Sequence, residues 1–446
     1  MRYLPNTRQN QRAMLDTIGV VSIEDLLVKI PAKARLARPL QLPPALAESD
    51  LVRHLWARAA ENADADGWVC FLGGGAYDHY VPSPIDHLIS RGEFFTAYTP
   101  YQPEASQGTL RTIYEYQSMI AELTGMDVAN ASIWDGASSL AEAALMAQAV
   151  TERSEVVLAG GVNPLYRRVV ATYCPPGTKL RDLPAPEGVL DAGAARKLCS
   201  DKTAALVVQS PNFYGCLEDV RAAAEIAHHV GAVLVVVADP FNLGVLEAPG
   251  TLGADVVVGE GQGLGVPLSY GGPYLGVFAA KQEFVRRMPG RLVGATVDVD
   301  GKRGFVLTLQ TREQHIRRAR ATSNICTNVA LCALMATVYL SILGKQGLAR
   351  AGELAMAKAH YAAERLGAVP GVSVRFPQPF FKEFTLRLPK PPDRMVARLA
   401  RSRILAGVPL KTFDRNLADC LLVAVTEKRT REEIDAFADE LAKAVA

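Results

Sequence analysis

The pattern of hydrophobic positions is most regular between about residues 67 and 280. Short apolar runs without polar alternation occur there between Ala-rich stretches with helical spacing. Strands of this kind are buried on both faces, which is typical of a mostly parallel sheet covered by helices. We predict strands at 156–159, 204–208, 233–238, 256–258 and 276–280, and helices that include 138–150 and 217–230.

The segments on either side of this region have other patterns. The N-terminal one contains two short helical patterns, at 11–18 and 23–30, and then several prolines, which predicts an arm that packs on another surface. The C-terminal part begins with helical patterns and ends with mixed strand and helix patterns. We therefore expect an arm at 1–60, a large α/β domain at 61–327, connecting helices at 328–366 and a small α+β domain at 367–446. Within the small domain we predict strands at 372–376, 384–388 and 420–424, and helices at 392–402 and 431–446.

Composition narrows the class of protein. The 446 residues carry a formal net charge of only +2, which argues against nucleic acid or an anionic membrane as partner. The seven cysteines are scattered and form no CxxC pair, so we expect no zinc site and a reducing, cytoplasmic location. The polar N-terminus is not that of a secretory signal. The uncharged stretch 328–344 is shorter than the roughly 20 residues of a membrane span, which favours a buried or linking helix.

Candidate chemistry follows the predicted strands, because ligands of parallel sheets bind beyond the carboxyl ends of the strands. Gly136, Ser138 and Ser139 open an Ala-rich helix, where they form either a phosphate cradle or an ordinary helix cap. Asp239 follows the most apolar strand. It either holds a protonated ring nitrogen of a cofactor or is a turn residue before a proline.

The Gly-rich stretches do not fit nucleotide-binding motifs. The run 259–264 begins like a dinucleotide fingerprint but has Leu264 where the last glycine belongs, and it lies late in the domain. The sequence contains no GxxxxGK[ST] motif. A Rossmann dehydrogenase is therefore the less favoured alternative.

A proline-stiffened loop at 95–108 is unusually dense in aromatic and polar side chains, which predicts a ligand site or a subunit interface rather than a merely well-bonded surface loop. A basic run at 317–327 could neutralise an anion. For Arg317 and Arg318 a solvated helix face is the better interpretation.

Two of these segments carry a resemblance to a known family. The sequences TAYTPYQPEASQG at 96–108, QSMIAELTGMDVANAS at 117–132 and RRARATSNICTN at 317–328 closely resemble glycine dehydrogenase (decarboxylating), the P-protein of the glycine cleavage system. The resemblance runs essentially from end to end and includes RYLPNT at 2–7 and FLGGGAYDHYVPSP at 71–84. At its length the chain resembles the alpha half of the two-subunit bacterial form, because the single-chain form is much longer.

The resemblance implies the aminotransferase-like fold of pyridoxal phosphate enzymes, fold type I. In that fold the phosphate lies at a helix N-terminus, an aspartate pairs with the ring nitrogen, and a lysine further along the chain forms a Schiff base. Gly136, Ser138, Ser139 and Asp239 match the first two requirements. The chain has no lysine between Lys202 and Lys281, and Gln262 stands near the expected position. Glutamine has no amine that condenses with an aldehyde, so we expect a vestigial pocket without covalent cofactor. Lys281 is a poor substitute, because it begins a predicted exposed helix.

The resemblance also implies a division of labour. A beta subunit would hold the pyridoxal phosphate and decarboxylate glycine, and the aminomethyl group would pass to the lipoyl arm of H-protein, in an α2β2 assembly. The residues that we expect to complete the partner's site are Tyr98, Tyr101, Gln102, Glu104, Gln107 and Arg320. Two alternatives are a catalytically silent scaffold, which stabilises the beta subunit or docks H-protein, and an independent pyridoxal phosphate lyase.

Overall fold

The computed structural model describes residues 6–36 and 38–446, in two units, Met1–Asn62 and Ala63–Ala446. The first unit contains α1 (Arg8–Ile18), α2 (Ile23–Leu26), the 3-10 helix η1 (Ala32–Ala34) and α3 (Glu48–Ala59), and none of these helices has a buried residue. The prediction of a helix at 23–30 was too long, and α3 was not predicted. Apolar side chains of α3 such as Leu55 and Trp56 are exposed within this unit.

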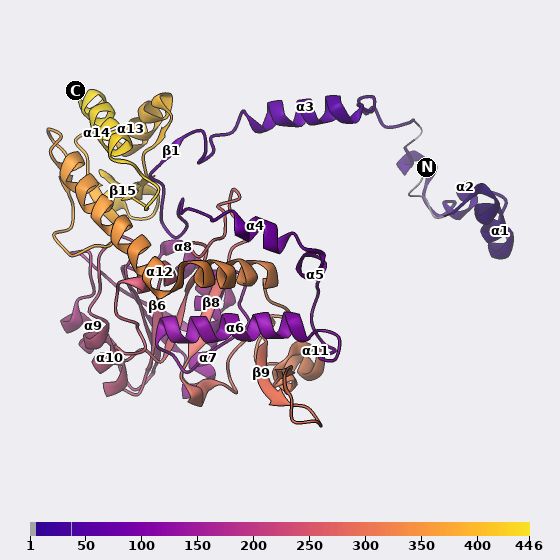
Figure 1. Cartoon of the computed structure of the whole chain (residues 1–446), viewed down its shortest axis with the longest axis horizontal. Coiled ribbons are helices and arrows are strands. Elements are labelled where there is room, and N and C mark those ends of the chain that lie inside the picture. Colours follow the sequence, from indigo (N-terminus) through magenta and orange to yellow (C-terminus); the bar gives the residue numbers. More distant parts are fainter. Residues whose placement is uncertain (1–5, 37) are drawn as a thin grey trace. The chain divides into compact units, whose positions relative to one another are not determined.

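A seven-stranded sheet forms the centre of the large domain (Figure 1). Its strand order is β2-β8-β7-β6-β5-β3-β4. The strands from β7 to β4 are parallel to their neighbours, and β8 runs antiparallel to β7 and β2. The predicted mostly parallel sheet is therefore confirmed, with two unpredicted strands, β2 and β4, at its edges. The strands are β2 (Val128–Ala129), β3 (Glu155–Ala159), β4 (Lys179–Leu183), β5 (Thr203–Gln209), β6 (Val233–Val237), β7 (Val256–Glu260) and β8 (Gly276–Ala280).

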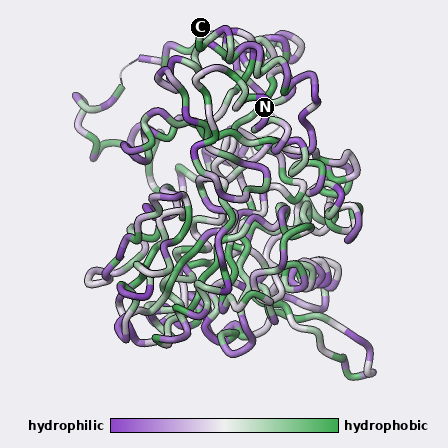
Figure 2. Tube along the Cα trace, turned by 90° about the vertical axis from the view of Figure 1, so that its left-hand side faces the viewer, coloured by the Kyte–Doolittle hydropathy of each residue, from purple (hydrophilic) through white to green (hydrophobic). Residues whose placement is uncertain are grey.

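Burial explains why the strands could be recognised. Every residue of β3, β6, β7 and β8 is buried, so these strands have no exposed face that would introduce polar alternation. Figure 2 shows hydrophobic segments running through the interior of the domain. The helices around the sheet are α4 (Pro84–Ile89), α5 (Gly92–Phe95), α6 (Gln107–Thr124), α7 (Gly136–Thr151), α8 (Pro164–Tyr173), α9 (Ala192–Leu198) and α10 (Val220–His229).

Two regions near the end of the large domain differ from the predictions. Lys281 precedes only a 3-10 helix, η3 (Gln282–Phe284), and its ammonium pairs with Asp255, so the predicted exposed helix is wrong. An unpredicted hairpin of β9 (Leu292–Val297) and β10 (Arg303–Thr308) projects from the domain, and α11 (Gln314–Arg317) follows it. The remaining 3-10 helices here are η2 (Pro240–Gly244), η4 (Gln310–Arg312) and η5 (Arg318–Arg320).

The long helix α12 (Ala330–Gly367) leads into the small domain (Figure 1). It joins the two predicted helices through a non-helical residue, Gly344, with φ 59° and ψ −176°. By length and composition α12 is apolar enough to cross a membrane. Its N-terminal half contacts α4 and α6, and residues such as Leu334 and Tyr339 are buried in the main hydrophobic core. These contacts are those of a core helix.

The small domain is an antiparallel sheet of order β11-β12-β15-β14 with two helices. Its core includes Phe384, Leu421 and Phe437. The strand β1 lies within the range 61–327 predicted for the large domain but pairs with β13 of the small domain, so the chain after β1 passes from the small domain to the sheet. The elements are β1 (Val69–Cys70), β11 (Ser373–Val374), β12 (Glu383–Arg387), α13 (Pro392–Leu399), η6 (Ala400–Ser402), β13 (Ile404–Leu405), β14 (Val408–Pro409), η7 (Leu410–Thr412), η8 (Arg415–Leu417), β15 (Cys420–Ala424) and α14 (Arg431–Val445).

Gly259 allows β7 to approach the end of β6 closely. A Cβ atom at this position would lie 1.8 Å from the carbonyl oxygen of Ala238. We predict that Gly259→Ala lowers the free energy of unfolding by about 1–3 kcal/mol or more, because the backbone must move. In the matched control Gly108→Ala, on helix α6, a Cβ atom meets nothing within 4 Å. That change should shift the free energy by less than about 1 kcal/mol in either direction. Urea unfolding of both variants tests this, and equal effects would contradict it.

Candidate functional site

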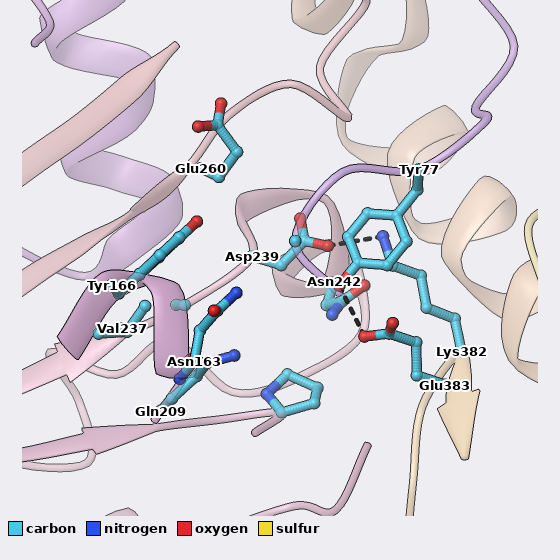
Figure 3. Close-up of a pocket in the computed structure, with 13 residues that line it drawn as sticks. Tyr77, Asn163, Tyr166, Gln209, Val237, Asp239, Asn242, Glu260, Lys382 and Glu383 are labelled. Carbon is cyan, nitrogen blue, oxygen red and sulfur yellow. Dashed lines mark hydrogen bonds and ion pairs between the residues drawn. The ribbon is translucent and has the colours of Figure 1, made fainter. Parts of the chain in front are cut away.

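Three side chains meet at the carboxyl ends of neighbouring parallel strands (Figure 3). Gln209 ends β5, Asp239 follows β6, and Glu260 ends β7. They line one pocket together with Lys382 and Glu383 of the small domain. The pocket therefore lies where parallel sheets bind their ligands, and the small domain closes it.

Lys382 pairs with Asp239 inside this pocket. The distance from its Nζ to Asp239 Oδ2 is 2.6 Å, and the side chains are only 2% and 15% exposed. The other carboxylate oxygen of Asp239 accepts the N–H of Phe241. Asp239 is thus both a turn residue and the partner of a cation, and the cation comes from this same chain.

Aromatic groups complete the surroundings of the Lys382 ammonium. Its Nζ lies 3.7 Å from the ring centroid of Tyr77 and 4.8 Å from that of Phe241, distances that suit cation–π attraction. His79 Nε2 lies 2.8 Å from the same Nζ. A buried cation is stable only when its neighbours replace the water that it has lost, and here an anion, an imidazole and two ring faces do so.

His79 connects Lys382 to a second residue of the small domain, Glu427. Burial and the nearby Lys382 lower the pKa of His79, so its neutral form accepts from Lys382 at Nε2 and donates from Nδ1 to Glu427, 2.7 Å away. Burial acts to raise the pKa of Glu427, but His79 and the Tyr80 N–H outweigh it and lower that pKa to about 2. The four groups Asp239, Lys382, His79 and Glu427 form one buried chain of contacts across the two domains.

Gln262 lies just after β7 and is 2% exposed. Its Oε1 accepts the N–H of Tyr77 at 2.8 Å, and its Nε2 donates to the carbonyls of Tyr77 at 3.1 Å and Val266 at 2.7 Å. The amide therefore fastens the segment after β1 to the sheet edge.

Glu260 faces the N-terminus of α7. Its carboxyl oxygens accept the N–H groups of Gly136 at 3.0 Å, Gln262 at 3.0 Å and Leu275 at 2.9 Å. Burial raises the pKa of Glu260 to about 8, against the effect of these three donors. Two further N–H groups of α7, those of Ser138 and Ser139, donate to the side chain and to the carbonyl of Asp135, respectively. Gly136, Ser138 and Ser139 thus belong to a capped helix end.

Glu383 is a third buried carboxyl group at the pocket. It accepts the hydroxyl of Tyr77 at 2.6 Å and the N–H of Gly74 at 2.7 Å. Burial raises the pKa of Glu383 to about 7. Among the residues that the structure describes, no group of His, Cys, Asp and Glu side chains is arranged to hold a metal ion.

The loop between α5 and α6 lies away from these residues in sequence and has its own anchor, Arg291. This guanidinium is 3% exposed and donates to the hydroxyls of Thr99 and Thr327 at 2.8 Å and of Tyr101 at 3.1 Å. It also lies 3.7 Å from Glu313. Arg291 therefore joins the loop at 95–108 to the basic run at 317–327.

The six predicted site residues are all exposed, and two of them, Tyr101 and Gln107, are also hydrogen-bonded within the chain. Tyr98 is 82% exposed and Tyr101 47% exposed. Gln107 exchanges two hydrogen bonds with the backbone of Phe305, which fastens α6 to the hairpin. Gln102, Glu104 and Arg320 are exposed.

Comparison with known proteins gives the family. The family model of the glycine cleavage system P-protein matches residues 1–441. The chain belongs to the P-protein family. It is 52% identical to proteins named probable glycine dehydrogenase (decarboxylating) subunit 1 from Desulforamulus reducens and Chloroherpeton thalassium, in each case over 442 residues and 99% of both chains.

Solved structures agree with the fold prediction. A crystal structure of glycine decarboxylase (P-protein) of the glycine cleavage system, in inhibitor-bound form, has a TM-score of 0.91 at 45% identity, with 100% of both chains covered. Glutamate decarboxylase from Lactobacillus brevis has a TM-score of 0.68 at 14% identity, with 93% of this chain and 95% of that chain covered, and shares the fold alone. The predicted fold type I of pyridoxal phosphate enzymes is therefore confirmed.

The pocket of this P-protein family member does not fit pyridoxal phosphate. The chain has no lysine between Lys202 and Lys281 that could form a Schiff base, and the Asp239 carboxylate already has a cation. The cavity between the lining residues measures about 30 Å³, which is room for water and not for a substituted ring. We derive no cofactor chemistry from this pocket.

The network predicts a strong coupling between Lys382 and Asp239. Lys382→Met leaves a carboxylate in the pocket without its cation and should lower the free energy of unfolding by about 3–5 kcal/mol. Adding Asp239→Asn removes the unpaired charge and should restore most of the loss. Urea unfolding of both single variants and the double variant measures the coupling. Additive effects of the two changes would show that the pair is not a unit.

Proposed function

We propose that the chain is the alpha subunit of a two-subunit glycine dehydrogenase (decarboxylating). In this proposal a beta subunit binds pyridoxal phosphate and glycine, carbon dioxide leaves, and the aminomethyl group passes to the lipoyl arm of H-protein. The observation that carries it is the missing amine: a chain with the fold of these enzymes has no lysine between Lys202 and Lys281, and Gln262, near the expected position, is an amide bonded to backbone groups.

The proposed role of the chain is to complete the partner's site with the loop Thr96–Ser106. The side chains of Tyr98, Tyr101 and Glu104 are exposed, so a partner can contact them. Aromatic residues and arginines are enriched in protein interfaces. Arg291 fixes the loop by hydrogen bonds from one buried guanidinium. A fixed loop can place side chains in a partner's site without a large entropic cost on binding. We propose an α2β2 assembly, as the resemblance implies.

A catalytically silent scaffold is the second candidate. The closed pocket favours a scaffold as strongly as it favours a shared site, because in both cases the beta subunit holds the cofactor. The loop distinguishes them, since a scaffold has no need of its carboxylate.

Substitution of loop residues should separate turnover from assembly. We predict that Tyr101→Phe and Glu104→Gln in the mixed complex each lower the rate of glycine decarboxylation at least about tenfold, because each change removes one positioned hydrogen bond in the transition state. Release of carbon dioxide from labelled glycine gives the rate, and size-exclusion chromatography gives the assembly. The matched control is Glu225→Gln, an exposed glutamate on α10, which should leave both unchanged. Full turnover in an intact complex for both loop variants would support the scaffold instead.

The location of the cofactor can be tested on the chain alone. We predict that the purified chain, mixed with pyridoxal phosphate, shows no Schiff-base absorbance beyond that of free cofactor, and that borohydride fixes no label at a single lysine. The beta subunit provides the positive control. Specific labelling of Lys281 or Lys382 would overturn the proposed division of labour.

A further inference from the structure

Pyridoxal phosphate presents three groups to a protein: an aldehyde for a lysine, a ring nitrogen for an acidic partner, and a phosphate for backbone N–H groups. We infer that this chain fills the last two places with its own side chains, Lys382 in place of the ring nitrogen and Glu260 in place of the phosphate. Restoring a lysine at position 262 is then insufficient to restore cofactor binding. This inference rests on the proposed function and extends it from a missing amine to a closed pocket.

Lys382 takes the place of a protonated ring nitrogen. Both are cations that pair with the Asp239 carboxylate, and the Lys382 ammonium already lies 2.6 Å from Oδ2 of that group. Tyr77 lies over the ammonium and is itself tied to Gln262 and Glu383 (Figure 3). The ammonium therefore cannot leave without disturbing the segment that crosses between the domains.

Glu260 takes the place of a phosphate at the start of α7. The N-terminal N–H groups of a helix are the usual donors to a phosphate, and here Glu260 and Asp135 accept those of Gly136, Ser138 and Ser139. A Cβ atom on Gly136 would lie 2.7 Å from the hydroxyl of Tyr166, which closes the helix end further. A phosphate would have to displace Glu260 from three N–H donors, one of which belongs to Gln262 itself.

The replacement of the ring nitrogen by Lys382 and of the phosphate by Glu260 explains why the pocket is stable without a ligand. An aspartate and a helix end that lost their ligand would leave a buried charge and buried N–H groups without partners, which is costly. Lys382 and Glu260 supply those partners from within the chain. The wild-type chain should accordingly gain no thermal stability from added pyridoxal phosphate, because a ligand stabilises only a fold that binds it.

Reconstruction of the pocket tests the inference. The variants are Gln262→Lys alone, Gln262→Lys with Glu260→Ala, Gln262→Lys with Lys382→Ala, and the triple variant. In each, the new amine would condense with the cofactor aldehyde with loss of water, and borohydride would then deliver hydride to the C=N bond. The readouts are absorbance titration with pyridoxal phosphate, peptide mapping of the reduced adduct and circular dichroism for folding. Pyridoxal without phosphate is the probe for the Glu260 step.

We expect Gln262→Lys alone to bind no better than surface lysines, and the triple variant to bind at position 262 at least about tenfold more tightly. The variant with Glu260→Ala should favour pyridoxal phosphate over pyridoxal, and the one with Lys382→Ala should not. If the triple variant does not fold, these two double variants decide the question. Binding by Gln262→Lys as tight as by the double variants would overturn the inference while leaving the proposed function intact. Specific binding by the wild-type chain would overturn both.

Discussion

The ion pair between Lys382 and Asp239 holds the small domain against the carboxyl end of the sheet. Taking two charges out of water costs several kcal/mol for each ion, and only close, well-surrounded pairs recover it. Here the pair is flanked by Tyr77, Phe241 and His79, and His79 connects to Glu427 in the small domain. The segment after β1, the strand ends and the small domain must all be in place for the complete set of contacts to form.

The same network decides what the chain can do chemically. Its groups already have partners within the chain. Gln262 bonds to backbone groups, Glu260 accepts from N–H donors, and Lys382 pairs with Asp239. A group whose polar atoms already have partners inside the fold is poorly placed to bind or activate a substrate. The loop anchored by Arg291 is different, because its anchor is buried while Tyr98 stays exposed. The chain thus combines a closed pocket with an outward-facing, fixed loop.

The residues that could be predicted for the site are those that lie at strand or helix ends. Asp239, Gln262 and the turn at Gly136 follow apolar runs, and the carboxyl ends of parallel strands meet at one edge. Glu260 also lies at a strand end, that of β7, but it was not predicted as a site residue, because the glycines around it resemble part of a nucleotide-binding motif. Lys382 and Arg291 could not be predicted, because their partners Asp239 and Thr99 lie more than a hundred residues away in sequence and no local spacing marks either contact.

The sequence by itself determined the sheet, the family and the missing lysine. Unbroken apolar runs such as 233–237 require burial on both faces, and the absence of an amine between 203 and 280 is a property of composition, independent of folding. Only the tertiary structure decided what fills the pocket. Ion pairs and N–H acceptance depend on atoms within about 3 Å. Folding creates that proximity when Lys382, just before β12, reaches Asp239 after β6, and when α7 begins beside Glu260 at the end of β7.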